Sequence, residues 1–158
     1  MAVYRVVNQA KQYRDPNAVQ DVIGYVTSAS KVSLDGVIGG AVLPEDAVTA
    51  MNRVTETYHK KSGPRLRHSV LSFSPEEVIT PRQAKKIAEE CVRYYEDDYQ
   101  IIAAVHEDQD HLHIHFVMNT TSYRTGREYH GVNADYYGFL KHMNQTTAPY
   151  GIRVKNTK

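Results

Sequence analysis

Residues 100–120, QIIAAVHEDQDHLHIHFVMNT, decide the fold of this chain. Residues 100–106 are almost continuously apolar, which predicts a buried strand, and residues 112–120 predict a second strand. The polar residues between them, 107–111, form a short turn, so the two strands read as a β-hairpin. Side chains alternate between the two faces of a strand. We therefore expect His113 and His115 on one face, and on the other the core residues Ile114, Phe116 and Met118.

On either side of this hairpin, strand-like and helix-like segments alternate. Further strands are predicted over residues 3–8 and 66–73, a strand or loop over 31–43, and a turn with a short strand over 149–154. Helices are predicted after Asp15, over 44–59, after Thr80 and over 134–145. This order predicts a single α+β domain. Its core is expected to be a central five-stranded, mainly antiparallel sheet flanked by helices, with the histidine-bearing strand near the middle.

Helix boundaries follow from local signals. Asp15-Pro16 predicts a helix start, because Asp caps free backbone N–H groups and Pro fits the first turn. Asn133 is expected to cap the last helix in the same way. Tyr25 lies beyond the edge of the apolar stripe of the first helix, so its side chain should point away from the core. That stripe consists of Val19, Val22, Ile23 and Val26.

Composition excludes several classes of protein. The 158 residues are 41% hydrophobic and 23% charged, which is typical of one soluble globular domain. No apolar run is long enough for a membrane helix, and the N-terminus does not resemble a signal peptide. A single cysteine, Cys91, excludes an intrachain disulfide and a multi-cysteine zinc site, which favours the cytosol. The formal net charge of +1 gives no electrostatic indication of nucleic acid, so such a partner must be argued from a site.

Four of the eight histidines fall within residues 106–115. His113 and His115 should leave the same face of their strand, and the hairpin brings His106 beside them. Three neutral imidazoles on a rigid sheet make a half-open metal site with room for an oxygen ligand. His111 competes with His106 for the place of third ligand. Asp108 and Asp110 would hold the far nitrogens of the ligands, although Asp is also an ordinary turn residue.

The spacing His106-x6-His113-x-His115, after an Ala-Ala-Val run, resembles motif III of the HUH-superfamily conjugative relaxases, and is most similar to the MOBP-type mobilisation nucleases. Residues 22–27, VIGYVT, resemble motif I, and residues 68–74, HSVLSFS, resemble motif II, in the same order along the chain. Residues 126–154 resemble the last helix and strand of that family. The likeness covers nearly the whole chain.

The resemblance implies metal-dependent, site- and strand-specific DNA nicking and rejoining at a transfer origin. Tyr25 would be the nucleophile and form a 5′-phosphotyrosyl intermediate. Tyr4 and Tyr13 are the nearest rival tyrosines. The ion would be one divalent metal, Mn or Mg in function, although imidazole ligands also suit Zn, Ni or Co. The general base stays open among Asp108, Asp110 and His111.

The same resemblance implies single-stranded origin-of-transfer DNA as the partner, with a hairpin beside the nick. Accessory relaxosome proteins and a coupling protein would join it in the bacterial cytoplasm. Ser72 would lie close to the DNA, and basic side chains would contact phosphates. The basic candidates are Lys60, Lys61 and Arg67. We expect residues 1–158 to form one relaxase domain, the N-terminal catalytic part of a longer protein.

Three other functions remain as alternatives. An HUH replication initiator or transposase carries its tyrosine after the histidine cluster, whereas Tyr25 precedes it here. A non-catalytic, metal-containing DNA-binding module would bind DNA whether or not Tyr25 is present. A metal-dependent hydrolase of small phosphoesters would turn over without forming a covalent link to DNA.

Overall fold

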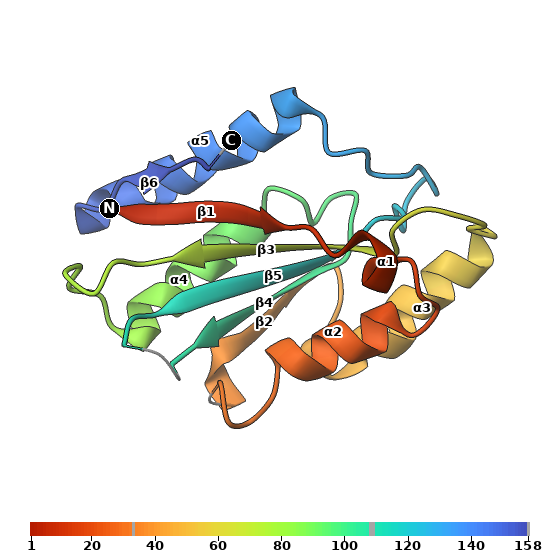
Figure 1. Ribbon diagram of the computed structural model, residues 1–158, viewed down its shortest axis with the longest axis horizontal. Coiled ribbons are helices and arrows are strands. Elements are labelled where there is room, and N and C mark those ends of the chain that lie inside the picture. Colours follow the sequence, from red (N-terminus) through yellow and green to blue (C-terminus); the bar gives the residue numbers. More distant parts are fainter. Residues whose placement is uncertain (33, 108–109, 158) are drawn as a thin grey trace.

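Six strands form one sheet in the order β2-β4-β5-β3-β1-β6. The computed structural model describes residues 1–32, 34–107 and 110–157 (Figure 1). All neighbouring strands are antiparallel except β1 and β6, which are parallel. The strands are β1 Ala2–Val7, β2 Val37–Gly40, β3 Leu66–Ser72, β4 Ile101–His106, β5 His113–Asn119 and β6 Val154–Lys155.

The α+β class and the mainly antiparallel sheet agree with the sequence prediction, and β5, which carries His113 and His115, is central. The predicted number of five strands was wrong. β6 joins the sheet because Val154 lies opposite Ala2, whose backbone N–H donates to the Arg153 carbonyl at 2.9 Å.

Helices cover both faces of the sheet (Figure 1). The α-helices are α1 Ala10–Tyr13, α2 Ala18–Val26, α3 Ala47–Thr57, α4 Pro81–Val92 and α5 Asn133–Thr147, and short 3-10 turns span Leu34–Gly36, Pro44–Asp46 and Ala148–Tyr150. Side chains of α4 and α5 share one apolar core with the sheet, and those of α2 and α3 share another. Among the helices that the structure describes, none is long and apolar enough to cross a membrane.

The alternation predicted for β5 is confirmed. Ile114, Phe116 and Met118 are buried in the core under α4 and α5, where Phe116 meets the Phe139 ring edge-on with centroids 5.8 Å apart. Val117 faces the other way and packs in the core under α2 and α3. The opposite face of β5 is therefore apolar at one end and carries histidines at the other.

Two predicted helix starts need correction. The Asp15 carboxylate accepts a hydrogen bond from the Asn17 N–H at 2.8 Å, which closes a turn before α2 instead of capping the helix. The N-cap position is Asn17 itself. At α5, Asn133 lies inside the first turn and Val132 takes the cap position without a side-chain hydrogen bond. Thr80 does start α4, in a reciprocal capping box with Gln83.

Candidate functional site

The three predicted ligand histidines lie on one face of the sheet. The register of β4 and β5 places His106 directly opposite His113, and His115 follows two residues later on the same face. The imidazole rings of His106 and His115 stack with centroids 3.9 Å apart, whereas those of His113 and His115 are 6.2 Å apart. The hairpin thus brings together the three side chains that the sequence singled out.

His106 also connects the sheet to α2. Its Nε2 lies 2.8 Å from the carbonyl oxygen of Val26, and the side chain is only 3% exposed. A carbonyl accepts but cannot donate, so Nε2 carries the hydrogen and, in the neutral ring, Nδ1 keeps its lone pair. The next residue of the strand, Glu107, donates its backbone N–H to the Lys31 carbonyl at 2.9 Å. Together these contacts hold the C-terminal end of α2 beside the histidines.

Tyr25 lies at this end of α2 and points outward, as predicted. It is 57% exposed, whereas its rivals Tyr4 and Tyr13 are 1% and 6% exposed. The Lys31 ammonium lies over the Tyr25 ring, 5.0 Å from its centroid. Of the three tyrosines, Tyr25 is the one that a large substrate reaches without rearrangement of the core.

A cavity of about 330 Å³ lies beside Tyr25. His68 on β3 and Tyr13 on α1 line it together with Asp21, which is one helical turn before Tyr25. The cavity therefore lies between the exposed phenol and a fourth histidine. Its complete lining is Val7, Gln9, Gln12, Tyr13, Asp21, Val22, Tyr25 and His68.

His68 and Tyr13 belong to a chain of hydrogen bonds that ends at His115. The Tyr13 hydroxyl lies 3.0 Å from His68 Nδ1, and His68 Nε2 lies 2.9 Å from His115 Nδ1. Burial lowers the pKa of His68 to about 4, with smaller contributions from Arg5 and His106. Burial also lowers the pKa of His115 to about 2, and the neighbouring histidines add to the shift. Both rings are therefore neutral near pH 7, the state that binds metals.

The sequence prediction did not assign a role to His68, although it lies within the segment that resembles motif II. Forty-seven positions separate His68 from His115. The sequence prediction also assigned no role to Lys31, which lies over the Tyr25 ring. A period-two pattern across residues 66–72 would have placed His68 on a defined face of its strand. That His68 lies beside His115 follows only from the register between β3 and β5.

The turn residues expected to hold the far nitrogens of the ligands, or to act as the base, differ in position. Asp108 lies outside the described residues, and Asp110 is exposed. His111 lies against His113, with their Nε2 atoms 2.9 Å apart. Within the described part of the chain, the buried Nδ1 of His111 has no hydrogen-bond partner. An orphaned nitrogen of this kind is expected where a ligand completes the site.

The predicted DNA-contacting residues are distributed along β3 and the loop before it. Ser72 lies directly opposite His113, at the histidine end of the sheet. Lys61 is exposed. Lys60 forms an ion pair with Glu128 and its side chain is only 4% exposed, an arrangement that occupies its charge within the protein.

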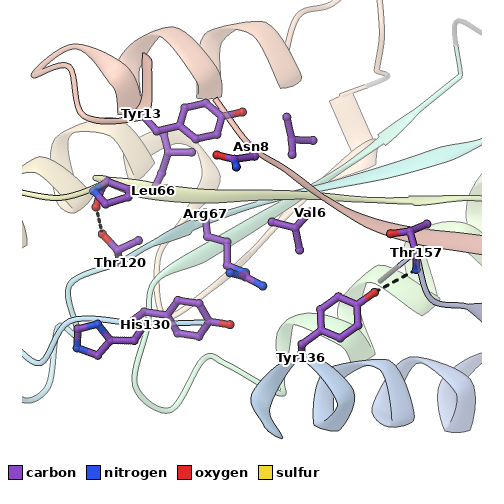
Figure 2. Close-up of a pocket in the computed structure, with 12 residues that line it drawn as sticks. Val6, Asn8, Tyr13, Leu66, Arg67, Thr120, His130, Tyr136 and Thr157 are labelled. Carbon is purple, nitrogen blue, oxygen red and sulfur yellow. Dashed lines mark hydrogen bonds between the residues drawn. The ribbon is translucent and has the colours of Figure 1, made fainter. Parts of the chain in front are cut away.

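Arg67 points into a second cavity, of about 470 Å³, with His130 on one side and Tyr136 on the other (Figure 2). Its guanidinium lies over the Tyr129 ring, 4.9 Å from the centroid. This cavity shares Val7 and Tyr13 with the cavity beside Tyr25. The two hollows are therefore neighbours, separated by the end of β1 and by α1.

The donor set of the site fits a divalent metal in kind. The histidines are imidazole donors, and His106 has one nitrogen bound to a backbone carbonyl, as metal-ligating histidines usually do. The orphaned Nδ1 of His111 is a further free donor. The side chains do not converge on one point. Among residues 1–32, 34–107 and 110–157, no group of three or more His, Cys, Asp or Glu residues is arranged to hold an ion.

Comparison with known sequences adds to this geometry. Residues 25–152 match the family described as “Relaxase: MobA/VirD2-like, nuclease domain”. The chain is 32% identical over 87 residues to protein rlx of Staphylococcus aureus. This alignment covers 55% of this chain and 27% of that protein. It is 29% identical over 75 residues to the group II intron-interrupted relaxase LtrB of Lactococcus lactis subsp. cremoris (strain MG1363), covering 47% and 13%. The chain thus spans less than a third of the length of these relatives.

The fold also has a counterpart among solved structures. A structure described as “Molecular Basis of Vancomycin Resistance Transfer in Staphylococcus aureus” superimposes with a TM-score of 0.66. The superposition covers 98% of this chain and 97% of that one, with 13% sequence identity. At this identity the likeness shows the fold alone.

Proposed function

The chain belongs to the relaxases with a MobA/VirD2-like nuclease domain, and from this premise we propose that it nicks and rejoins one DNA strand at a transfer origin. The reaction would initiate conjugative mobilisation of a plasmid or integrative element. The observation that carries the proposal is the position of Tyr25, which is exposed beside a cavity and held next to a histidine cluster.

In the proposed reaction, Tyr25 Oη forms a bond to phosphorus while the bond from phosphorus to O3′ breaks. The phenolic proton passes to a base, and O3′ takes up a proton to leave as a free 3′-hydroxyl. The 5′-phosphate stays on Tyr25 as a phosphodiester, so attack by a 3′-hydroxyl rejoins the strand without an external energy source. Asp108, Asp110 and His111 remain candidates for the base, and Asp21 joins them because it lines the same cavity as Tyr25.

We propose that His106, His113 and His115 hold one divalent cation, Mn or Mg in function, at a site that Zn, Ni or Co also suit. A cation bound there supplies electrostatic stabilisation of charge on the phosphodiester oxygens. Lys31 supplies a further positive charge close to the Tyr25 ring. The hydrogen bond from His106 to Val26 fixes the distance between the histidines and the helix that carries Tyr25.

The two neighbouring cavities support a path for the DNA. We propose that the strand passes Tyr25, crosses the end of β1 at Val7 and reaches the cavity of Arg67. Arg67 would pair with a phosphate there, and Ser72 and Lys61 would contact the strand elsewhere. Lys60 is a weaker candidate for this role, because its charge is paired with Glu128.

We also propose the wider setting of the reaction. Residues 1–158 would form the single N-terminal catalytic domain of a longer protein, acting in the bacterial cytoplasm. Single-stranded transfer-origin DNA with an adjacent hairpin would be its partner, together with relaxosome proteins and a coupling protein. The match covers less than a third of the length of each relative, which supports the proposal that this domain is part of a longer protein.

Formation of a covalent protein–DNA adduct tests this function. The protein is incubated with Mn²⁺ and single-stranded oligonucleotides tiled across the DNA flanking its gene, and a band shift is read on a denaturing gel. We expect an adduct that disappears with chelator and in Tyr25→Phe. Tyr137→Phe, at another exposed tyrosine, is the matched control and should keep the adduct. An adduct that survives Tyr25→Phe would exclude Tyr25 as the nucleophile. Binding without any adduct would favour a non-catalytic DNA-binding module.

A further inference from the structure

We propose that a cavity lined by four tyrosines binds one base of the DNA strand, and that it prefers a base with an exocyclic amino group. The cavity, of about 380 Å³, lies between the residues that follow α4 and those that lead into α5. The proposed nicking reaction does not use it, and the inference rests on that function only in taking DNA as the ligand. Its lining is Tyr94, Tyr95, Asp98, Tyr99, Tyr129, His130, Gly131, Val132 and Asp135.

The tyrosine rings of the cavity hold one another in fixed orientations. Tyr129 meets Tyr99 edge-on with centroids 5.6 Å apart, and meets Tyr95 edge-on with centroids 5.9 Å apart. Tyr95 is buried and Tyr94 packs against both Tyr95 and Phe139, whereas Tyr99 is half-buried at the cavity wall. Bases stack on aromatic rings that are fixed in place and partly open. We therefore expect the base to stack on Tyr99.

Two carboxylates give the cavity its polarity. The hydroxyls of Tyr95 and Tyr129 both donate to Oδ2 of Asp135, that of Tyr95 at 2.7 Å. Burial raises the pKa of both phenols, so the hydroxyls stay protonated and remain donors to the carboxylate. In the described part of the chain, Asp135 thus keeps Oδ1 available to accept from a ligand. Asp98 also lines the cavity, but its side chain is 48% exposed and is paired with Arg124, so we assign the base contact to Asp135.

A free acceptor selects a ligand that donates. An ionised carboxylate accepts hydrogen bonds and cannot donate. Cytosine, adenine and guanine each carry an exocyclic NH₂ group, whereas thymine carries a keto oxygen where cytosine has its amino group. That keto oxygen would face the carboxylate oxygen, and two acceptors repel each other. The cavity should therefore discriminate most clearly between the two pyrimidines, cytosine and thymine.

Arg67 connects this cavity to the proposed path of the strand. Tyr129 and His130 line both the tyrosine cavity and the cavity of Arg67, and Figure 2 shows His130 beside the arginine. The Arg67 guanidinium lies over the Tyr129 ring, and a Cβ added to Gly131 would lie 2.5 Å from its Nη1. A nucleotide whose phosphate pairs with Arg67 would thus have its base beside the tyrosine cavity. An organic ammonium ion, which aromatic rings also attract, would be repelled by this guanidinium.

Binding of single nucleotides tests the site in the full chain. Deoxycytidine and deoxythymidine 5′-monophosphates (dCMP and dTMP) are titrated into protein with ¹³C-labelled tyrosine rings, and NMR shifts of Tyr94, Tyr99 and Tyr129 report binding in the cavity. We expect dCMP to bind about 10-fold more tightly than dTMP, the effect of one hydrogen bond to a charged group. Tyr99→Leu should weaken both nucleotides about 10-fold through loss of stacking, and Tyr99→Phe should restore both. Tyr137→Leu, at an exposed tyrosine of α5 outside the cavity, is the matched control and should bind as the wild type does.

Asp135→Asn should give a result that a general loss of structure cannot produce. The Asn oxygen can accept from the two tyrosine hydroxyls, which turns the amide NH₂ toward the ligand. This NH₂ group donates to the keto oxygen of thymine, so the preference should invert and dTMP should bind more tightly than dCMP. Equal binding of both nucleotides to the wild type would overturn the proposal. An unchanged preference for dCMP in Asp135→Asn, with thermal unfolding showing that the variant is folded, would overturn it as well.

The result is separable from that of the adduct assay. Adduct formation without nucleotide binding in the cavity would leave the nicking function in place and refute the base site. Nucleotide binding with the expected preference, but no adduct on any DNA strand, would support the base site and favour a non-catalytic DNA-binding module. If tetramethylammonium shifts the tyrosine signals and neither nucleotide does, the cavity is a cation site and the proposal is refuted.

Discussion

Replacing His106 should separate its anchoring of α2 from its role as a ligand. His106→Leu removes the N–H that reaches the Val26 carbonyl at 2.8 Å, and both residues are buried. A buried carbonyl that loses its donor costs about 1–3 kcal/mol. His106→Gln keeps an amide N–H that can replace the donor. We therefore expect the Leu variant to be about 1–3 kcal/mol less stable than the wild type, and the Gln variant to lose under about 1 kcal/mol.

Urea unfolding of the metal-free protein, followed by circular dichroism, measures these differences, since a change in midpoint at constant slope reports stability. His142→Leu is the matched control, because His142 Nε2 also contacts a carbonyl, that of Glu90 at 2.7 Å, but in a solvent-accessible position where water can replace it. It should change the free energy of unfolding by less than about 0.5 kcal/mol. Equal stability of the Leu and Gln variants of His106 would refute the reasoning, because it would mean that the Val26 contact contributes nothing. Both variants should still lose cation binding.

Three further predictions concern the rest of the fold. Gly126→Ala should lower the free energy of unfolding more than Gly151→Ala does. Both residues have positive φ, which costs about 1 kcal/mol for Ala, but a Cβ at Gly126 would lie 2.2 Å from the Tyr58 ring, while a Cβ at Gly151 meets nothing within 4 Å. Equal losses of stability in urea unfolding would contradict this. Burial raises the pKa of Tyr4 to about 12, so the stability it contributes is complete below pH 10 and is lost as the pH rises through 12, a fall of about 3 kcal/mol. Unfolding between pH 9 and 11 should show a shallower decline in Tyr4→Phe, and an identical decline would contradict the assignment. Burial also raises the pKa of the Cys91 thiol, so a thiol reagent should label it only at the rate of unfolding, and rapid labelling under native conditions would show that the core under α4 opens.

The face of each histidine on β5 could be predicted from sequence, because strand alternation is a local property. Ile114 and Phe116 are apolar and His113 and His115 are not, so the pattern itself shows which side enters the core. The outward position of Tyr25 was predictable for the same reason, from the apolar stripe of its helix.

Contacts between distant segments could not be predicted in this way. The pairing of His68 with His115 depends on strand order and register, and that of Lys60 with Glu128 joins residues 68 positions apart. The helix α1 was missed because its four residues are too few for a periodic pattern. The pattern of residues 31–43 predicts either a strand or a loop, and the structure shows a four-residue strand there.

The pairing of β6 with β1 has a consequence for synthesis of the chain. Val154 and Lys155 lie beside Ala2 and Val3, and the Thr157 hydroxyl donates to the Tyr4 carbonyl at 3.1 Å. Contacts of such long sequence separation form late, because the loop between them must close first. During translation the outer edge of β1 therefore stays unpaired until residues 154–155 have left the ribosome. Until then, the nascent chain exposes an open strand that another nascent copy can pair with.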